Sequence, residues 1–119
     1  MINESQKEYW NGEVGERWAE RDAFMARLLE PAGVVLLEAL SPLRGIDALD
    51  IGCGGGSQTL LLAERIREGG SILGVDISGP LLECAKEKVS GYESTGAKVR
   101  FLHTDAAAHN FVPHSVDLI

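Results

Sequence analysis

Four of the five residues in the segment 52–56 are glycine, and this cluster limits the local fold more tightly than any other part of the sequence. It follows the apolar run 46–51 and precedes the segment 57–68, which has the pattern of a helix ended by Gly69. Glycines between a strand and a helix let the backbone adopt positive φ angles and approach a ligand closely. The cluster therefore predicts a strand, a ligand-binding turn and a helix with Ser57 as its N-cap.

Strand-like and helix-like segments alternate along the remaining sequence. Ser71–Asp76 and Lys98–His103 have the patterns of strands, and a further strand begins at 116–119. The segment 80–90 has the pattern of a helix capped by Ser78, and Glu83, Lys86, Glu87 and Lys88 are expected to form its solvated face. Strands that alternate with helices form parallel sheets with right-handed crossovers. We therefore expect an α/β fold with a parallel sheet in the strand order third, second, first, fourth (3-2-1-4), with the glycine cluster at its switch point.

Residues 1–44 have no strand pattern and are expected to be helical. Apolar residues recur at helical spacing over 14–29, and Pro31 is expected to open a second helix that ends at Ser41. The sequence thus divides into an N-terminal helical extension, residues 1–44, and a ligand-binding α/β half, residues 45–119.

Acidic residues accompany the ends of three predicted strands. Asp50 lies two residues before Gly52, Asp76 ends the second strand 20 residues after Gly56, and Asp105 follows the third strand. The carboxyl ends of parallel strands are where open α/β sheets bind ligands. A carboxylate at the position of Asp76 can accept hydrogen bonds from both hydroxyls of an adenosine ribose.

Two features of the glycine cluster argue against a dinucleotide ligand. The dinucleotide fingerprint needs a third glycine five residues after its first. Counted from Gly52 that position is Ser57, and counted from Gly54 it is Thr59. The Asp50 carboxylate would repel a pyrophosphate but attract an ammonium or a sulfonium, and the segment 51–62 has no basic residue. The cluster therefore favours a positively charged nucleoside, and S-adenosylmethionine fits that description.

Composition and charge argue against several classes of ligand and of cellular location. A chain of 119 residues can form at most one compact domain, and its net charge of −7 without a basic cluster argues against nucleic acids and anionic membrane surfaces. No apolar run is long enough to cross a bilayer. Cys53 and Cys84 show no disulfide pattern, so we expect a cytoplasmic protein. The spacing of His103, His109 and His114 matches no metal-ligand pattern, so we expect no metal.

The motifs resemble, in order and spacing, those of class I S-adenosylmethionine-dependent methyltransferases. Residues 48–56 (ALDIGCGGG) resemble the first motif, 74–78 (GVDIS) the second, 103–106 (HTDA) the third and 115–119 (SVDLI) the start of the fourth. Residues 9–18 resemble the N-terminal extension of bacterial small-molecule methyltransferases, similar to those of quinone biosynthesis. The resemblance spans nearly the whole chain and implies a Rossmann-like sheet. It is specific for the cofactor and unspecific for the methyl acceptor.

The resemblance implies a set of cofactor-binding residues but no catalytic residue. Asp50 and the glycines would hold the methionine part, and Asp76 the ribose hydroxyls. Ile77 would pack on the adenine, Asp105 would accept from its amino group, and the Ala106 N–H would reach a ring nitrogen. The implied set is Tyr9, Trp18, Asp50, Gly52, Gly54, Gly56, Asp76, Ile77, Asp105 and Ala106.

Three further positions carry expectations of their own. Tyr9 and Trp18 have the helical spacing of core residues, whereas the resemblance implies that they lie over the cofactor as part of a lid. Gly55 stands where the family more often has Thr or Ser, and we expect little loss from this departure.

These observations predict an S-adenosylmethionine-dependent methyltransferase that acts on a small molecule, with this chain as its N-terminal, cofactor-binding part. Because the sequence stops within a predicted strand, we expect a truncated fold that binds the cofactor without transferring a methyl group. We also expect self-association or a partner chain to cover the edge at 116–119. Two alternatives remain: a non-catalytic binding subunit on a truncated methyltransferase fold, and a nicotinamide-dependent oxidoreductase domain.

Overall fold

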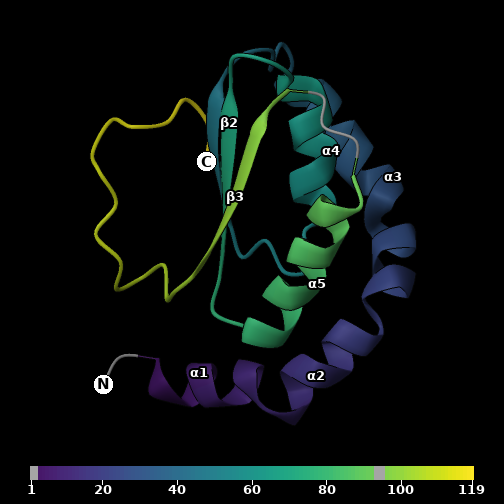
Figure 1. Cartoon of the computed structure of the whole chain (residues 1–119), viewed down its shortest axis with the longest axis vertical. Helices are drawn as coiled ribbons and strands as arrows, with labels where there is room; N and C mark the ends of the chain where they lie inside the picture. The colour runs from purple at the N-terminus through teal and green to yellow at the C-terminus, as the bar shows by residue number, and fades with distance from the viewer. Residues whose placement is uncertain (1–2, 93–95) are drawn as a thin grey trace.

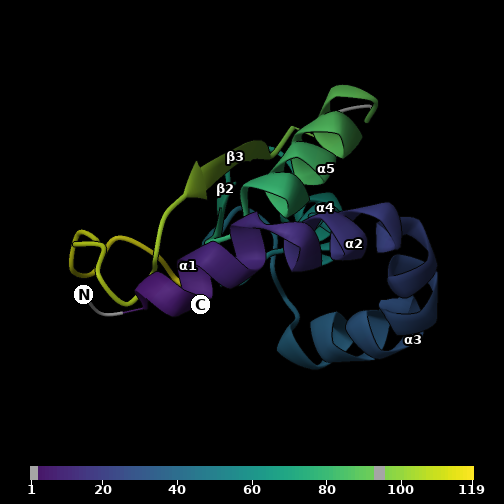
Figure 2. The same ribbon diagram turned by 90° about the horizontal axis from the view of Figure 1, so that it is seen from below.

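Three helices begin the chain and curve around one side of the molecule (Figure 1). The computed structural model describes residues 3–92 and 96–119. Helix α1 spans Glu4–Asn11, α2 spans Glu13–Glu20 and α3 spans Asp22–Leu40. Seen from below, α1 and α2 follow one another across α5, and the chain then turns into α3 (Figure 2). The predicted helical character of the N-terminal segment is confirmed for these ranges.

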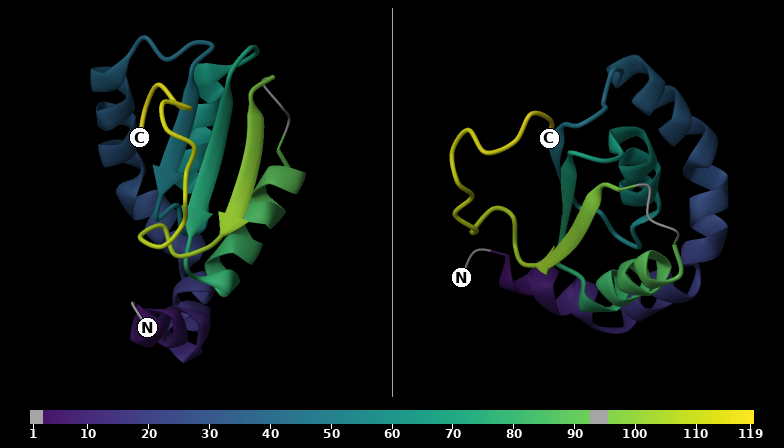
Figure 3. Two further views of the ribbon diagram at one scale, coloured as in Figure 1. Left: turned by 90° about the vertical axis from the view of Figure 1, so that its left-hand side faces the viewer. Right: turned by 45° about the horizontal axis from the view of Figure 1, so that its top comes forward.

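The rest of the chain alternates strands and helices. Strand β1 spans Asp47–Ile51, α4 spans Ser57–Ile66, β2 spans Ser71–Asp76, α5 spans Gly79–Ser90 and β3 spans Lys98–His103. The three strands are parallel in the order β1-β2-β3. Helices α4 and α5 cover one face of this sheet, and the segment after β3 crosses the other face (Figure 3). The predicted α/β fold with a parallel sheet is confirmed.

The predicted fourth strand is reduced to a single bridge. Leu118 forms an isolated parallel bridge with Ala48, and its carbonyl accepts a hydrogen bond of 2.9 Å from the Leu49 N–H. The segment 116–119 therefore lies beside β1, but the described part of the chain contains three strands instead of the expected four. One bridge is too short to constitute a strand, so the observed order is 3-2-1.

Helix boundaries differ from the sequence prediction at Pro31. We expected a new helix to begin there, but α3 continues through the proline without a break. Proline removes the hydrogen bond that its N–H would donate to the carbonyl of Arg27. Both residues are exposed, so solvent can satisfy that carbonyl and the helix tolerates the loss.

The two predicted N-caps have different outcomes. Ser78 caps α5, since its Oγ accepts a hydrogen bond of 3.4 Å from the Leu81 N–H. Ser57 is wrong as a cap, because α4 begins at that residue and Gly56, with φ of 84°, occupies the cap position. Only glycine takes this conformation at low cost, which leaves the Ser57 hydroxyl free for another partner.

The main core lies between the sheet and the helices. Ile66, Ile72 and Ala63 are at most 1% exposed, and Leu37 is the single buried residue of α3. The remainder of α3 displays large apolar side chains, among them Phe24 and Leu28, each at least 60% exposed. No helix in the ranges 3–92 and 96–119 has both the length and the apolar character needed to span a bilayer.

The aromatic residues of α1 and α2 are not in this core. Tyr9 is 51% exposed and Trp18 is 44% exposed, so the expectation that they pack in the interior is wrong. Both contact Trp10, whose ring centroid lies 5.3 Å from that of Tyr9 and 6.1 Å from that of Trp18. Helices α1 and α2 pack chiefly against α5 and against each other, and these few contacts cannot cover every aromatic face.

Candidate functional site

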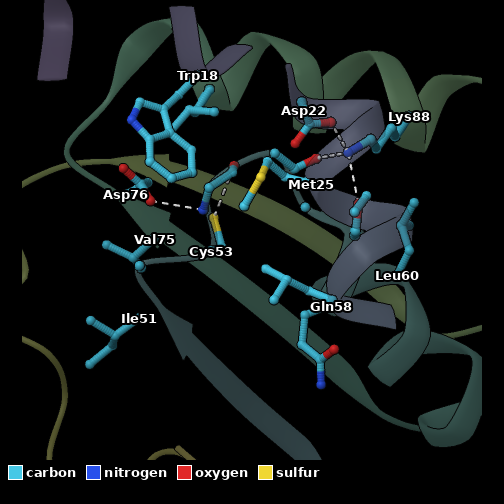
Figure 4. Close-up of a pocket in the computed structure, with 18 of the residues that line it drawn as sticks. Trp18, Asp22, Met25, Ile51, Cys53, Gln58, Leu60, Val75, Asp76 and Lys88 are labelled. Atoms are coloured by element: carbon cyan, nitrogen blue, oxygen red, sulfur yellow. Dashed lines mark hydrogen bonds and ion pairs between the residues drawn. The ribbon is translucent and has the colours of Figure 1, made fainter. Parts of the chain in front are cut away.

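A cavity of about 840 Å³ lies at the carboxyl ends of the strands (Figure 4). One side is formed by the residues that follow β1, β2 and β3, and the other by residues of α1, α2 and α3. Of the residues expected to hold a cofactor, those that line the cavity are Trp18, Gly52, Gly54, Gly56, Asp76, Ile77, Asp105 and Ala106. Tyr9 and Asp50 do not line it, and the roles assigned to all ten stay predictions.

The glycine loop, residues 52–56, turns sharply over the end of β2. Gly52, Gly54 and Gly56 have φ angles of 74°, 54° and 84°, a region that side chains strongly disfavour. The N–H groups of Gly52 and Cys53 both donate to the Val75 carbonyl, at 2.7 and 3.1 Å. A Cβ added to Gly52 or Gly54 would meet no atom within 4 Å, so the loop backbone is open to a ligand.

Asp76 joins the glycine loop to the turn after β2. Its Oδ2 accepts a hydrogen bond of 2.8 Å from the Gly54 N–H, and its Oδ1 accepts one of 2.8 Å from the Ser78 N–H. A carboxylate has about four lone-pair sites, so both oxygens keep capacity for a further donor. Asp76 is therefore both a support of the loop and an acceptor that faces the cavity, beneath Trp18 (Figure 4).

Asp50 lies behind the loop instead of in the cavity. Its Oδ2 accepts a hydrogen bond of 2.8 Å from the Thr59 hydroxyl, and Thr59 is fully buried. Burial raises the pKa of Asp50, the Thr59 hydrogen bond opposes that rise, and the charge of Asp76 adds to it. Burial followed by the charges of these two acids also raises the pKa of Cys53 to about 12, so this thiol is a poor nucleophile.

Asp105 is 8% exposed and bonded on both carboxylate oxygens. The Asn3 side-chain amide donates to Oδ2 and the Ala107 N–H donates to Oδ1, both at 2.9 Å. These two donors, in that order, hold the pKa of Asp105 below its usual value. The structure thus places an ionised carboxylate beside Ala106 at the cavity edge, and it adds Asn3 as a partner that the motifs did not reveal.

Lys88 contradicts the sequence prediction for its helix. We expected it to lie on a solvated face with Lys86, which does form an exposed ion pair with Glu83. Lys88 instead reaches the glycine loop, where its Nζ donates to the Gly55 carbonyl at 2.8 Å and also forms an ion pair with Asp22. The lack of basic residues within 51–62 therefore does not mean that the folded loop lacks a nearby cation.

The spacing of residues along α5 is a sequence signal for the position of Lys88. The buried residues Leu81 and Ala85 precede Lys88 by seven and three positions. Residues at these intervals share one face of a helix, which here is the face turned toward the glycine loop. No comparable signal exists for Asp22, because its partner is distant in the sequence.

Polar contacts fasten α1 to the turn that follows Asp76. The Asn11 side chain donates to the Ile77 carbonyl and accepts from the Gly79 N–H, both at 2.8 Å. The Ser78 hydroxyl donates to the Trp10 carbonyl at 2.7 Å. These contacts hold Trp10 at the cavity, whereas Tyr9 faces a separate hollow of about 300 Å³.

The arrangement offers carboxylates, open backbone and apolar surface rather than a metal centre. Within the described ranges, no three histidine, cysteine, aspartate or glutamate residues gather closely enough to hold a metal ion. Lys88, which donates to the Gly55 carbonyl of the loop, is already paired with Asp22. The site can therefore bind a ligand that carries hydroxyl donors, a flat apolar ring and positive charge.

Comparison with known proteins gives consistent matches. A family model described as a methyltransferase domain matches residues 48–119. The nocamycin O-methyltransferase of Saccharothrix syringae is 38% identical over 61 residues, which cover 51% of this chain and 22% of that protein. A demethylmenaquinone methyltransferase of Staphylococcus aureus is 34% identical over 76 residues, covering 64% of this chain and 30% of that protein. The chain thus spans less than a third of the length of these relatives.

Solved structures show the same fold. The magnesium protoporphyrin IX methyltransferase of Synechocystis, with S-adenosylmethionine bound, matches with a TM-score of 0.65 and 23% identity, over 89% of this chain and 55% of that one. A phosphoethanolamine N-methyltransferase of Haemonchus contortus, in complex with S-adenosylhomocysteine, matches with a TM-score of 0.63 and 28% identity, over 74% of this chain and 20% of that one.

Proposed function

This chain belongs to the class I methyltransferase family through the domain at residues 48–119, and we propose that it forms the cofactor-binding part of an S-adenosylmethionine-dependent methyltransferase. The observation that carries the proposal is the position of Asp76. Its carboxylate fixes the glycine loop and the following turn while its remaining lone pairs face the cavity. An adenosine ribose presents two adjacent hydroxyl donors that can use them.

The residues present fit S-adenosylmethionine. The open backbone at Gly52 and Gly54 gives room for the methionine part, and Ile77 gives an apolar surface for an adenine ring. Asp105 and the Ala106 N–H lie at the same edge and supply one acceptor and one donor for that ring. The acids, and the pairing of Lys88 with Asp22, suit a sulfonium ligand better than a phosphate.

The protein's contribution to methyl transfer would be alignment and charge. When bound, S-adenosylmethionine supplies an electrophilic methyl group on a sulfonium. The glycine loop and Asp76 would hold it in one orientation, and proximity of this kind provides most of the advantage in a bimolecular displacement. Trp18 and Met25 form an apolar surface on the opposite side of the cavity, which supports a small-molecule acceptor.

Three further proposals concern the strand order, the edge at 116–119 and the cellular compartment. The bridge at Leu118 supports a fourth strand position beside β1, and with it the strand order 3-2-1-4. The exposed Ile119 at that edge supports pairing with further β-structure or with a second chain. The free thiols of Cys53 and Cys84 support a reducing, cytoplasmic setting.

Calorimetric titration tests the proposal directly. The chain is expected to bind S-adenosylhomocysteine and S-adenosylmethionine and to give no response with NAD. S-adenosylhomocysteine retains the ribose and adenine that Asp76 and Asp105 would recognise, and it has no phosphate. Binding of NAD without binding of S-adenosylhomocysteine would show that the site serves a dinucleotide.

A further inference from the structure

Lys88 connects three segments that are far apart in the sequence. Its Nζ donates to the Gly55 carbonyl at 2.8 Å and to the Ser57 hydroxyl at 2.9 Å, and it forms an ion pair with Asp22 at the start of α3 (Figure 4). The side chains of Lys88 and Asp22 are 27% and 16% exposed, so the pair is largely removed from solvent. Charge-assisted hydrogen bonds in such a setting are stronger than those on an open surface.

The contact at Gly55 fixes one peptide plane of the glycine loop from both sides. The Gly55 carbonyl accepts from Lys88, and the Gly56 N–H of the same peptide donates to the Cys53 carbonyl at 3.1 Å. Because a peptide group is planar, fixing its carbonyl and its N–H sets the orientation of the whole unit. This unit ends the turn that opens α4 and lines the cavity.

Gly55 differs from the other loop glycines in the reason why a side chain is unfavourable at its position. Gly52, Gly54 and Gly56 have positive φ angles, but Gly55 does not, so its backbone would allow a side chain. A Cβ on Gly55 would overlap the carboxylate of Asp22, so a side chain there would have to displace Asp22 from its ion pair with Lys88. The absence of a side chain at position 55 is therefore matched to the presence of Asp22.

We propose that Lys88 and Asp22 are positioning residues that hold the glycine loop in its ligand-binding shape and dock α3 against it at the same time. Loop and helix then form one unit, and Trp18 is held over the cavity between this ion pair and the Asn11 contacts of α1. The inference rests on the proposed function, since the loop shape is measured through binding of S-adenosylhomocysteine. Docking of the helices is measured separately, through the alkylation rate of a thiol that α2 partly covers.

Cys84 supplies that separate measurement. Its thiol lies on α5 and donates to the Ala19 carbonyl of α2 at 3.7 Å, so α2 partly covers it. Undocking of the helices would expose this thiol to an alkylating reagent. Burial and then the charge of Asp22 raise the pKa of Cys84, and the charge of Lys88 opposes that rise, so removing Lys88 would by itself raise the pKa further and slow alkylation. Faster alkylation of a Lys88 variant can therefore come only from exposure.

The first experiment compares Lys88→Met with Lys86→Met in the 119-residue chain. Lys88→Met is expected to weaken S-adenosylhomocysteine binding about tenfold, the loss expected for about one charge-assisted contact, and to accelerate alkylation of Cys84. Lys86→Met removes the same charge from an exposed pair on the same helix and should change neither quantity. Equal binding and equal alkylation of the two variants would overturn the proposal.

The second experiment uses the steric match between Gly55 and Asp22. Gly55→Ala alone and Asp22→Ala alone should each weaken binding, but the double variant should bind more tightly than Gly55→Ala alone because the overlap is gone. Losses that simply add would overturn the proposal, since residues with independent roles give additive effects. Circular dichroism melting confirms that each variant is folded.

Failure of the proposed function and failure of the positioning role would give different experimental results. If the unmodified chain does not bind S-adenosylhomocysteine, the proposed function is wrong, and the Cys84 alkylation rates of Lys88→Met and Lys86→Met still decide whether the ion pair docks α3. If the unmodified chain binds and Lys88→Met binds equally well, the proposed function stands and the positioning role is wrong.

Discussion

The two sides of the cavity are held together by different kinds of contact. The strand side, formed by the glycine loop and Asp76, is fastened by hydrogen bonds between residues 9 and 22 positions apart, and it lies on a buried core. The helical side, formed by α1 to α3, is fastened chiefly by polar contacts between residues 65 to 102 positions apart, with one shorter-range contact from Gln58 to the Gly33 carbonyl. Leu37 is the one buried side chain of α3. One side is therefore part of the sheet, and the other is docked onto it.

The difference indicates that ligand affinity and helix docking are separable properties. Changes on the strand side should remove both binding and stability, because the loop joins β1 to α4, and both of these elements contribute residues to the core. Changes on the helical side should loosen the cavity while the sheet stays folded. Four sets of substitutions can break or sharpen this comparison.

The largest effect is expected from Asp76→Ala. It removes the acceptor of the Gly54 and Ser78 N–H groups and, in our proposal, two bonds to the ribose. Charge-assisted hydrogen bonds contribute about 1.5–3 kcal/mol each, so affinity for S-adenosylhomocysteine should fall at least about a hundredfold. Asp105→Ala, which would lose about one ligand bond, should cost about tenfold. Equal losses in a titration would contradict the assignment of the two acids.

The second comparison is between Ile66→Ala and Leu28→Ala. Ile66 is fully buried under the sheet, and its truncation should reduce the free energy of unfolding by about 2–5 kcal/mol through the cavity that it leaves. Leu28 is 61% exposed on α3, and its truncation should change that free energy by less than about 0.5 kcal/mol. Urea unfolding measures both. A large effect at Leu28 would show that α3 is covered in solution.

A smaller effect is expected from Asn11→Ala on the helical side. The change removes the two hydrogen bonds of 2.8 Å that join α1 to the Ile77–Gly79 turn. Neutral hydrogen bonds contribute about 0.5–1.5 kcal/mol each, and these two would affect the ligand only indirectly, through the position of α1, so binding should weaken only about three- to tenfold with little change in unfolding. Asn11→Asp keeps the acceptor for the Gly79 N–H and should bind with intermediate affinity. Unfolding as severe as that of Ile66→Ala would refute the separation of the two sides.

The smallest effect concerns Asp50 and pH. Burial raises its folded-state pKa above the ordinary value of 3.8, so the stability linked to this group is full below that value and is lost as the pH rises through the raised pKa. Asp50→Asn keeps an acceptor for Thr59 and should raise the melting temperature near neutral pH. The advantage should shrink as the pH falls toward 3.8. A constant difference across this range would show that the charge of Asp50 is not the cause.

The sequence predicted the strand side better than the helical side, for a physical reason. The bounds of β2 and β3 match the prediction, because apolar runs between turn residues indicate strands locally. The places of Asp76 and Asp105 follow from the same patterns, because parallel strands bring their carboxyl ends to one edge. Each of these inferences needs only neighbouring residues.

The errors occur where tertiary contacts override local patterns. Pro31 is a helix-opening signal that α3 passes through, and 116–119 has a strand pattern but forms one bridge. Asp22 and Asn11 have partners 66 residues away, and nothing in their own sequence neighbourhood indicates these contacts. Lys88 is a different case, because its interval of three residues from the buried Ala85 places it on the inner face of α5.

The tryptophans of this chain have an optical consequence. The sequence contains two, Trp10 and Trp18, both line the cavity, and their rings lie 6.1 Å apart on the helical side. Intrinsic fluorescence excited in the red edge of the indole band therefore originates entirely at the cavity. An adenine that enters beneath Trp18 would change both the intensity and the wavelength of that emission, so the unlabelled protein can report its own ligand binding in a fluorimeter.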